Sequence, residues 1–126
     1  MGHTYAKVVF HGQKEKRVVE RVLVDTGATY TIMPASLAEE IGVFLTPYRS
    51  QLTLADKSRK GVSIGLVEVE VEGRREPVQV AIIDDVVLVL GVQALEALGF
   101  EVNPVSKKLE VIRDSGGLAL KFVGPS

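Results

Sequence analysis

The segment RVLVDTGATYTIMP, from Arg21 to Pro34, contains the most informative pattern in the chain. Three apolar residues lead directly into an acid, Asp25, and a small hydroxyl residue and a glycine follow it. An isolated Asp-Thr-Gly is typical of a turn, in which the Asp accepts hydrogen bonds from nearby backbone N–H groups and the Gly supplies a positive φ. Here the acid directly follows an apolar segment that we expect to form a strand. Because a carboxylate at the buried end of a strand is costly unless it is paired, we interpret Asp25 as a candidate functional residue.

The composition is that of one globular domain, which we place at residues 1–126. The chain is 46% hydrophobic and 25% charged, and it contains no cysteine, so disulfides, thiolate nucleophiles and cysteine-ligated zinc are excluded. Its 15 basic and 16 acidic residues give a net charge of -1, which offers no reason to expect nucleic acid or an anionic membrane as partner. No apolar run is as long as a membrane span, and the first residues lack a secretory pattern. We therefore expect a cytoplasmic protein.

Hydrophobic periodicity predicts a mostly β domain with one or two short helices. Charged segments at 13–17 and 56–60 lie between apolar runs and predict two hairpins, and residues 74–76 are expected to form a further turn. Glycines after 34–41 and 92–98 are typical of helix ends. The strands that we expect are 6–12, 18–25, 50–55, 61–65, 66–72, 77–83, 86–91, 108–112 and 116–123, and the helices are 34–42 and 92–99.

The acid at the turn suggests hydrolysis by a pair of carboxylates. Two acids that share one proton can activate a water with one member and protonate a carbonyl oxygen with the other. The chain offers no convincing second copy, because the Asp-Ser-Gly at Asp114 lacks a preceding apolar strand. If the chemistry needs two acids, the second must be Asp25 of another copy. A two-fold homodimer places equivalent residues together on its axis.

The sequence resembles the retropepsin-type aspartic proteases, in their single-domain prokaryotic branch. The similar motifs are VLVDTGATYTIMP, the run VLVLG followed by VQALEALG (Val87–Gly99), and LTLADKSRKGVSIG, which lies where that family has a flap hairpin. The resemblance extends from Tyr5 to Ile112 and implies a retropepsin-like closed β-barrel (the acid protease fold). It also implies a homodimeric aspartic endopeptidase that acts on peptide or protein substrates and uses neither cofactor nor metal.

Site residues follow from the resemblance by position. Asp25 corresponds to the catalytic acid, Thr26 to the residue that bonds across the dimer axis, and Gly27 to the residue that lets the substrate backbone approach. The tail 113–126 has no clear counterpart in the family, and its segment 117–123 could either interleave at the dimer interface, as retroviral chain termini do, or pack on its own subunit. The positions expected to contact substrate are Ala28, Thr29, Ala55, Asp56, Lys57, Val87 and Val89.

Two features depart from the retroviral pattern and keep alternatives open. Thr29 and Val92 stand where an acid and an arginine brace the retroviral dimer, and the flap tip DKSRK has one acid, three bases and Gly61 as its only glycine. One alternative is a peptide-binding or dimerisation module with the same fold and weak catalysis. Another is a metal-dependent hydrolase built on Asp25 together with Asp84 and Asp85.

Overall fold

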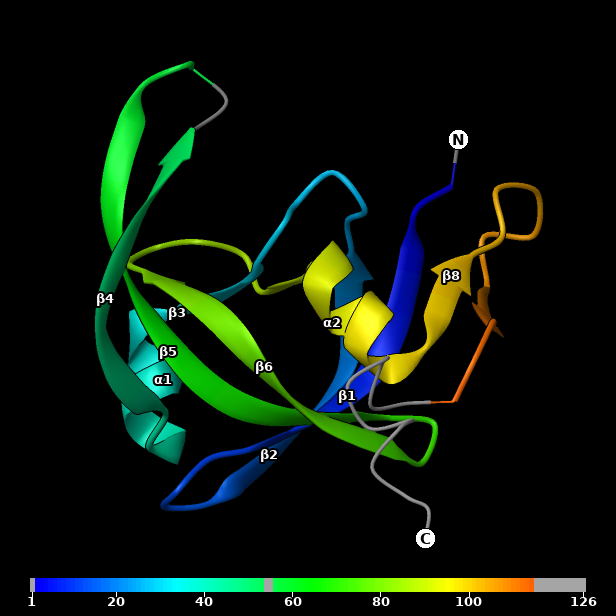
Figure 1. Cartoon of the computed structure of the whole chain (residues 1–126), viewed down its shortest axis with the longest axis horizontal. Coiled ribbons are helices and arrows are strands. Elements are labelled where there is room, and N and C mark those ends of the chain that lie inside the picture. Colours follow the sequence, from blue (N-terminus) through cyan, green and yellow to red (C-terminus); the bar gives the residue numbers. More distant parts are fainter. Residues whose placement is uncertain (1, 54–55, 115–126) are drawn as a thin grey trace, which may run out of the picture.

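The computed structural model describes residues 2–53 and 56–114, and within them the chain is mostly β, with two short helices. Figure 1 shows the elements in sequence colours. No helix in these ranges is long and apolar enough to cross a membrane. The elements are β1 Thr4–His11, β2 Lys16–Val24, β3 Thr31–Pro34, α1 Ala35–Ile41, β4 Phe44–Thr53, β5 Arg59–Val71, β6 Arg74–Ile83, β7 Val89–Leu90, α2 Val92–Leu98, β8 Phe100–Val102 and β9 Leu109–Val111.

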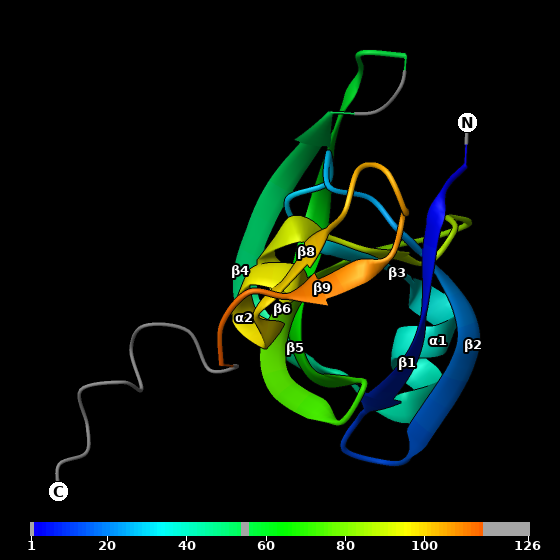
Figure 2. The same cartoon turned by 90° about the vertical axis from the view of Figure 1, so that its right-hand side faces the viewer.

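The main sheet closes on itself, as a barrel requires. Its strand order is β1-β2-β7-β3-β6-β5-β4, and β1 also pairs with β5, so the ring of hydrogen-bonded pairs returns to its first strand. The strand β4 lies outside that ring and pairs with β5 in a long hairpin, which projects from one end of the molecule (Figure 1). The strands β8 and β9 form a separate small sheet beside α2 (Figure 2). This architecture confirms the predicted fold class.

The core follows from the alternation in the strands. In β5 the side chains of Val67, Val69 and Val71 are buried, whereas Glu68 and Glu70 between them are partly exposed. Large apolar side chains from several elements fill the ring, and the hydrophobic effect of burying them is the main source of stability. The largest of these fully buried apolar side chains are Phe10, Met33, Ile41, Leu90, Leu95 and Leu98.

The predicted turn at residues 74–76 was wrong. The chain instead turns at Glu72 and Gly73, which both have positive φ (50° and 82°), and β6 already begins at Arg74. A two-residue turn with both φ values positive matches the twist of a hairpin. Charged residues at 74–76 suggested a loop, but a charged side chain can also be accommodated in the strand, since Arg75 forms an ion pair with Glu68 on β5 at 2.7 Å.

The predicted strand 86–91 is much shorter than expected. Only Val89 and Leu90 form ladder pairs, while Val87 is 71% exposed. The apolar run 86–88 looked like a strand buried on both sides, but it follows an exposed turn at Asp84 and Asp85. The strands β3 and β8 were not predicted, because each is too short to show a period. The predicted strand 116–123 lies outside the described residues.

Candidate active site

The Asp25 turn sits at the end of β2, as the sequence predicted. The backbone N–H of Gly27 donates to Asp25 Oδ1 at 2.8 Å, and the N–H of Ala28 donates to the Asp25 carbonyl at 3.1 Å. The first bond orients the carboxylate and the second holds the backbone of the turn, so no partner side chain is needed. The expectation of a buried carboxylate was wrong for the single chain, because Asp25, Thr26 and Gly27 are all exposed. Burial ends at Val24, one residue earlier.

Backbone hydrogen bonds fasten this turn to the start of α2. The Asp25 N–H donates to the Leu90 carbonyl at 3.0 Å, and the Val92 N–H donates to the Ala28 carbonyl at 2.8 Å. The two segments that carried the family resemblance are therefore in direct contact, although they are far apart in sequence. These hydrogen bonds to β7 and α2 therefore help to set the position of the acid.

A buried hydrogen bond between Gly91 and Thr31, which was not predicted from the sequence, also joins these two segments. The Gly91 N–H donates to Thr31 Oγ1 at 3.1 Å, and Thr31 is only 1% exposed. A Cβ at Gly91 would lie 2.3 Å from the Tyr30 carbonyl oxygen and 2.9 Å from that of Ala28. Only a glycine lets the loop approach this closely. The available sequence signal was a threonine within an apolar segment and a glycine directly before a helix.

An open cavity of about 650 Å³ begins at Asp25. Figures 1 and 2 place the β4–β5 hairpin at the same end of the molecule as the turn after β2, so the hairpin rises beside the cavity. Other cavities of about 550 and 680 Å³ are not lined by the Asp25 turn. The cavity is mostly apolar around the single carboxylate. Its lining residues are Asp25, Gly27, Ala28, Thr29, Tyr30, Ile32, Gln51, Leu52, Thr53, Ile83, Val86, Val87 and Val89.

Most of the residues that the sequence singled out lie in this wall. They are Asp25, Gly27, Ala28, Thr29, Val87 and Val89. Thr26 is exposed on the turn and does not line the cavity. Asp56 and Lys57 are exposed at the hairpin tip, away from its walls, and Ala55 lies outside the described residues. The side chains of Tyr30, Ile32 and Leu52 belong to the wall but were not predicted.

The charges near the cavity do not form a metal site. In the parts of the chain that the structure describes, no three His, Asp or Glu side chains are grouped to hold a metal ion. The structure thus does not bring Asp25, Asp84 and Asp85 together as ligands. At the hairpin tip, hydrogen bonds from the Ser58 hydroxyl and then the Ser58 N–H lower the pKa of Asp56, because they stabilise its charged form.

Comparison with solved structures identifies the fold class. The chain is similar to the structure described as "EIAV protease complexed with the inhibitor HBY-793", with a TM-score of 0.58 and 18% identity. The match covers 78% of this chain and 89% of the other. The architecture is therefore retropepsin-like.

Comparison of sequences identifies the family. The model of the aspartyl protease family matches residues 6–104, which include the Asp25 turn, the hairpin and α2. This chain belongs to the aspartyl protease family. No curated protein matches it by sequence.

Proposed function

We propose that the protein is an aspartic endopeptidase in which two copies of the chain each supply Asp25 to one active site. The observation that carries the proposal is the exposed, backbone-oriented carboxylate at the end of an apolar cavity in a chain of this family. The Gly27 N–H donates to Oδ1 of the Asp25 carboxylate, and Oδ2 accepts no hydrogen bond within the described residues. That oxygen is available to a water or to a second acid.

The exposure of the turn supports a shared site. Asp25, Thr26 and Gly27 are all exposed in the single chain, directly beside the buried end of β2. A second copy packed against this turn would remove water from it, and an isologous interface would bring the two carboxylates together. Two adjacent carboxylates cannot both be ionised easily, so they would hold one proton between them.

The reaction follows from this single shared proton. The ionised Asp25 takes a proton from a water, whose oxygen attacks the peptide carbonyl carbon, while the protonated Asp25 gives its proton to the carbonyl oxygen. The resulting tetrahedral diol breaks its C–N bond as the nitrogen takes up the proton of the acid pair, and one hydroxyl group of the diol returns a proton to that pair as its C=O bond forms. One water is consumed, and a carboxylic acid and an amine are released. The apolar wall is suited to hold hydrophobic side chains beside the cleaved bond.

The test is cleavage of a diverse peptide mixture, read by mass spectrometry. Wild type and Asp25→Asn are compared from about pH 3 to about pH 7 and at several protein concentrations. We expect cuts only with wild type, and we expect the rate to rise faster than linearly with concentration where dimers dissociate. Equal cleavage by Asp25→Asn would overturn the mechanism. A folded, dimeric wild type that cuts nothing would favour a peptide-binding module.

A further inference from the structure

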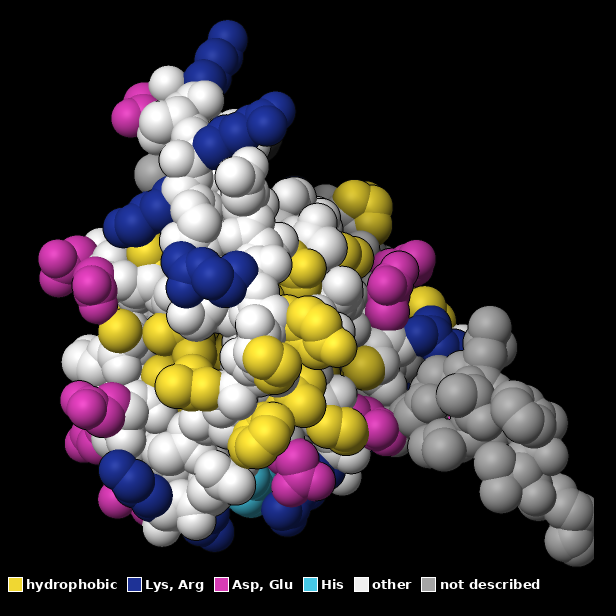
Figure 3. All heavy atoms as spheres, turned by 60° about the vertical axis from the view of Figure 1, so that its left-hand side comes forward, with side chains coloured by type: hydrophobic (Ala, Val, Ile, Leu, Met, Phe, Trp, Pro, Cys, Tyr) yellow, Lys and Arg dark blue, Asp and Glu magenta, His cyan; other side chains and the backbone are white. Residues whose placement is uncertain are grey.

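The β4–β5 hairpin beside the cavity carries a concentrated positive charge. Its segment 44–60 holds four cations and one acid, in a chain whose net charge is -1. Figure 3 shows the Lys and Arg side chains on the projecting hairpin and hydrophobic side chains gathered below it. The four cations are Arg49, Lys57, Arg59 and Lys60.

Within residues 2–53 and 56–114, these cations form no ion pair with an acid of the chain. The one acid of the hairpin, Asp56, is bound by Ser58, which donates its N–H at 2.9 Å and its hydroxyl at 2.5 Å. The ion pairs found among the described residues involve none of the four cations. Arg49 donates one bond to Ser63 Oγ at 3.1 Å, and a guanidinium has five N–H donors, so most of its donors are free for a ligand.

The cavity that begins at Asp25, here the first cavity, adjoins a second cavity of about 390 Å³. Tyr30 belongs to the walls of both cavities, and β4 runs along both, with residues 51–53 at the first and 48–50 at the second. An extended peptide that leaves the apolar cavity along β4 therefore reaches the second one. The second cavity is lined by Tyr30, Thr46, Tyr48, Arg49, Ser50, Ile64, Leu66 and Gln79.

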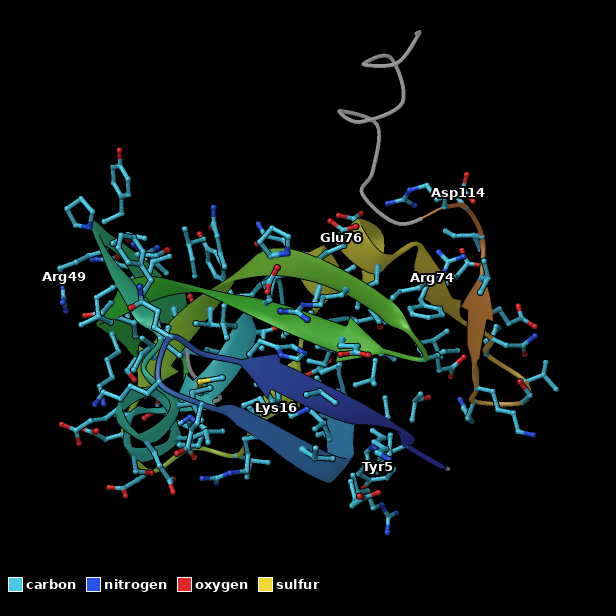
Figure 4. The ribbon with its side chains drawn as sticks, turned by 90° about the horizontal axis from the view of Figure 1, so that it is seen from below. Tyr5, Lys16, Arg49, Arg74, Glu76 and Asp114 are labelled. Atoms are coloured by element: carbon cyan, nitrogen blue, oxygen red, sulfur yellow. The ribbon has the colours of Figure 1, made fainter. Side chains whose placement is uncertain are left out.

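Among the described residues, Arg49 is the one cation that lines either cavity. Figure 4 shows it projecting from β4 at the outer edge of the sheet. The surrounding wall combines apolar contacts with amide and hydroxyl groups, so a peptide side chain would meet both hydrophobic surface and a fixed positive charge. A guanidinium presents paired N–H donors in the geometry that a carboxylate accepts.

We infer that the second cavity is a substrate subsite for an Asp or Glu side chain, with Arg49 as its specificity-determining residue. The inference rests on the proposed peptidase function, because it extends the same cleft. The substrates that it predicts have apolar residues around the cleaved bond and one acidic residue further along the peptide, on the side that lies along β4.

The experiment uses matched peptides that differ only by Glu or Gln at one position, scanned along both sides of a cut site. Wild type should cleave the Glu peptide with a kcat/KM about 1.5- to 5-fold higher at one position, which is the range for a solvent-exposed charge pair. Arg49→Gln should remove this difference. The matched control is Arg59→Gln, which deletes a hairpin cation outside both cavities and should keep the difference.

Binding measurements keep this inference separate from the proposed function. The same peptides, carrying a fluorophore, are titrated into Asp25→Asn protein with and without Arg49→Gln. A Glu preference that depends on Arg49 in binding supports the subsite even if wild type cuts nothing. The inference is overturned if Glu is preferred over Gln at no peptide position, neither in cleavage nor in binding. Equal loss in the Arg49 and Arg59 variants would also overturn it, because it would indicate general attraction by the hairpin.

Discussion

The hydrogen bond between Gly91 and Thr31 offers a sharp test of how the catalytic turn is held in place. In Thr31→Val the side chain keeps its shape but loses the oxygen that accepts from the Gly91 N–H at 3.1 Å. Thr31 is 1% exposed, so water cannot replace the lost acceptor. Leaving a buried donor unsatisfied costs about 1–3 kcal/mol. Because a domain of this kind is stable by about 5–15 kcal/mol, the variant should still fold.

The matched control is Thr4→Val, in which the same chemical change is made on another buried strand position. Thr4 is 6% exposed, and its hydroxyl makes no side-chain hydrogen bond with the described residues. The free energy of unfolding is measured for both variants by urea titration. We expect Thr31→Val to be less stable than Thr4→Val by about 1–3 kcal/mol. A difference below about 0.5 kcal/mol would show that the bond does not hold the two segments together.

Three further changes test the close contact, the hairpin tip and the cavity wall. Gly91→Ala should cost about 2 kcal/mol or more in unfolding free energy, since its Cβ would lie 2.3 Å from the Tyr30 carbonyl; near-wild-type stability would contradict that contact. Ser58→Ala should raise the pKa of Asp56, measured by carboxyl NMR titration. Because the pKa of Asp56 is lowered in the folded chain, its bonds with Ser58 stabilise the hairpin tip at neutral pH, and this stabilisation is lost as the pH falls through the lowered pKa. An unchanged pKa of Asp56 in Ser58→Ala would refute the turn geometry. Val87→Ala, at a side chain 71% exposed, should change stability by less than about 0.5 kcal/mol yet change which peptides are cut; an unchanged cleavage pattern would remove Val87 from the wall.

Local signals explain which parts of the fold could be predicted. The hairpins, both helices and the turn at Asp25 depend on alternation, helix-ending glycines and turn residues that lie within a few positions of one another. Gly42 and Gly99 do end the helices with φ of 76° and 82°. The β4–β5 hairpin also formed where the polar tip predicted it.

The errors at the candidate site arose where the outcome depends on distant parts of the chain. The pairing of Gly91 with Thr31 joins residues sixty positions apart, and neither residue reveals the other locally. The run after Asp85 is apolar because it lines a cavity, and its composition is the same as that of a buried strand. The exposure of Asp25 could not be predicted from its apolar neighbours. Those residues indicate only that the preceding strand is buried, and they do not indicate whether another part of the chain covers Asp25.

The most direct test of the central claim is a mixing experiment with an inactive chain. Wild type is held at a fixed concentration, and Asp25→Asn protein is added under conditions in which chains exchange. If each active site needs Asp25 from two copies, a threefold excess of the variant leaves about a quarter of the wild-type chains paired with each other. Peptide cleavage should then fall to about a quarter of its starting rate. An unchanged rate would mean that one chain provides a complete site, which would contradict the shared acid pair.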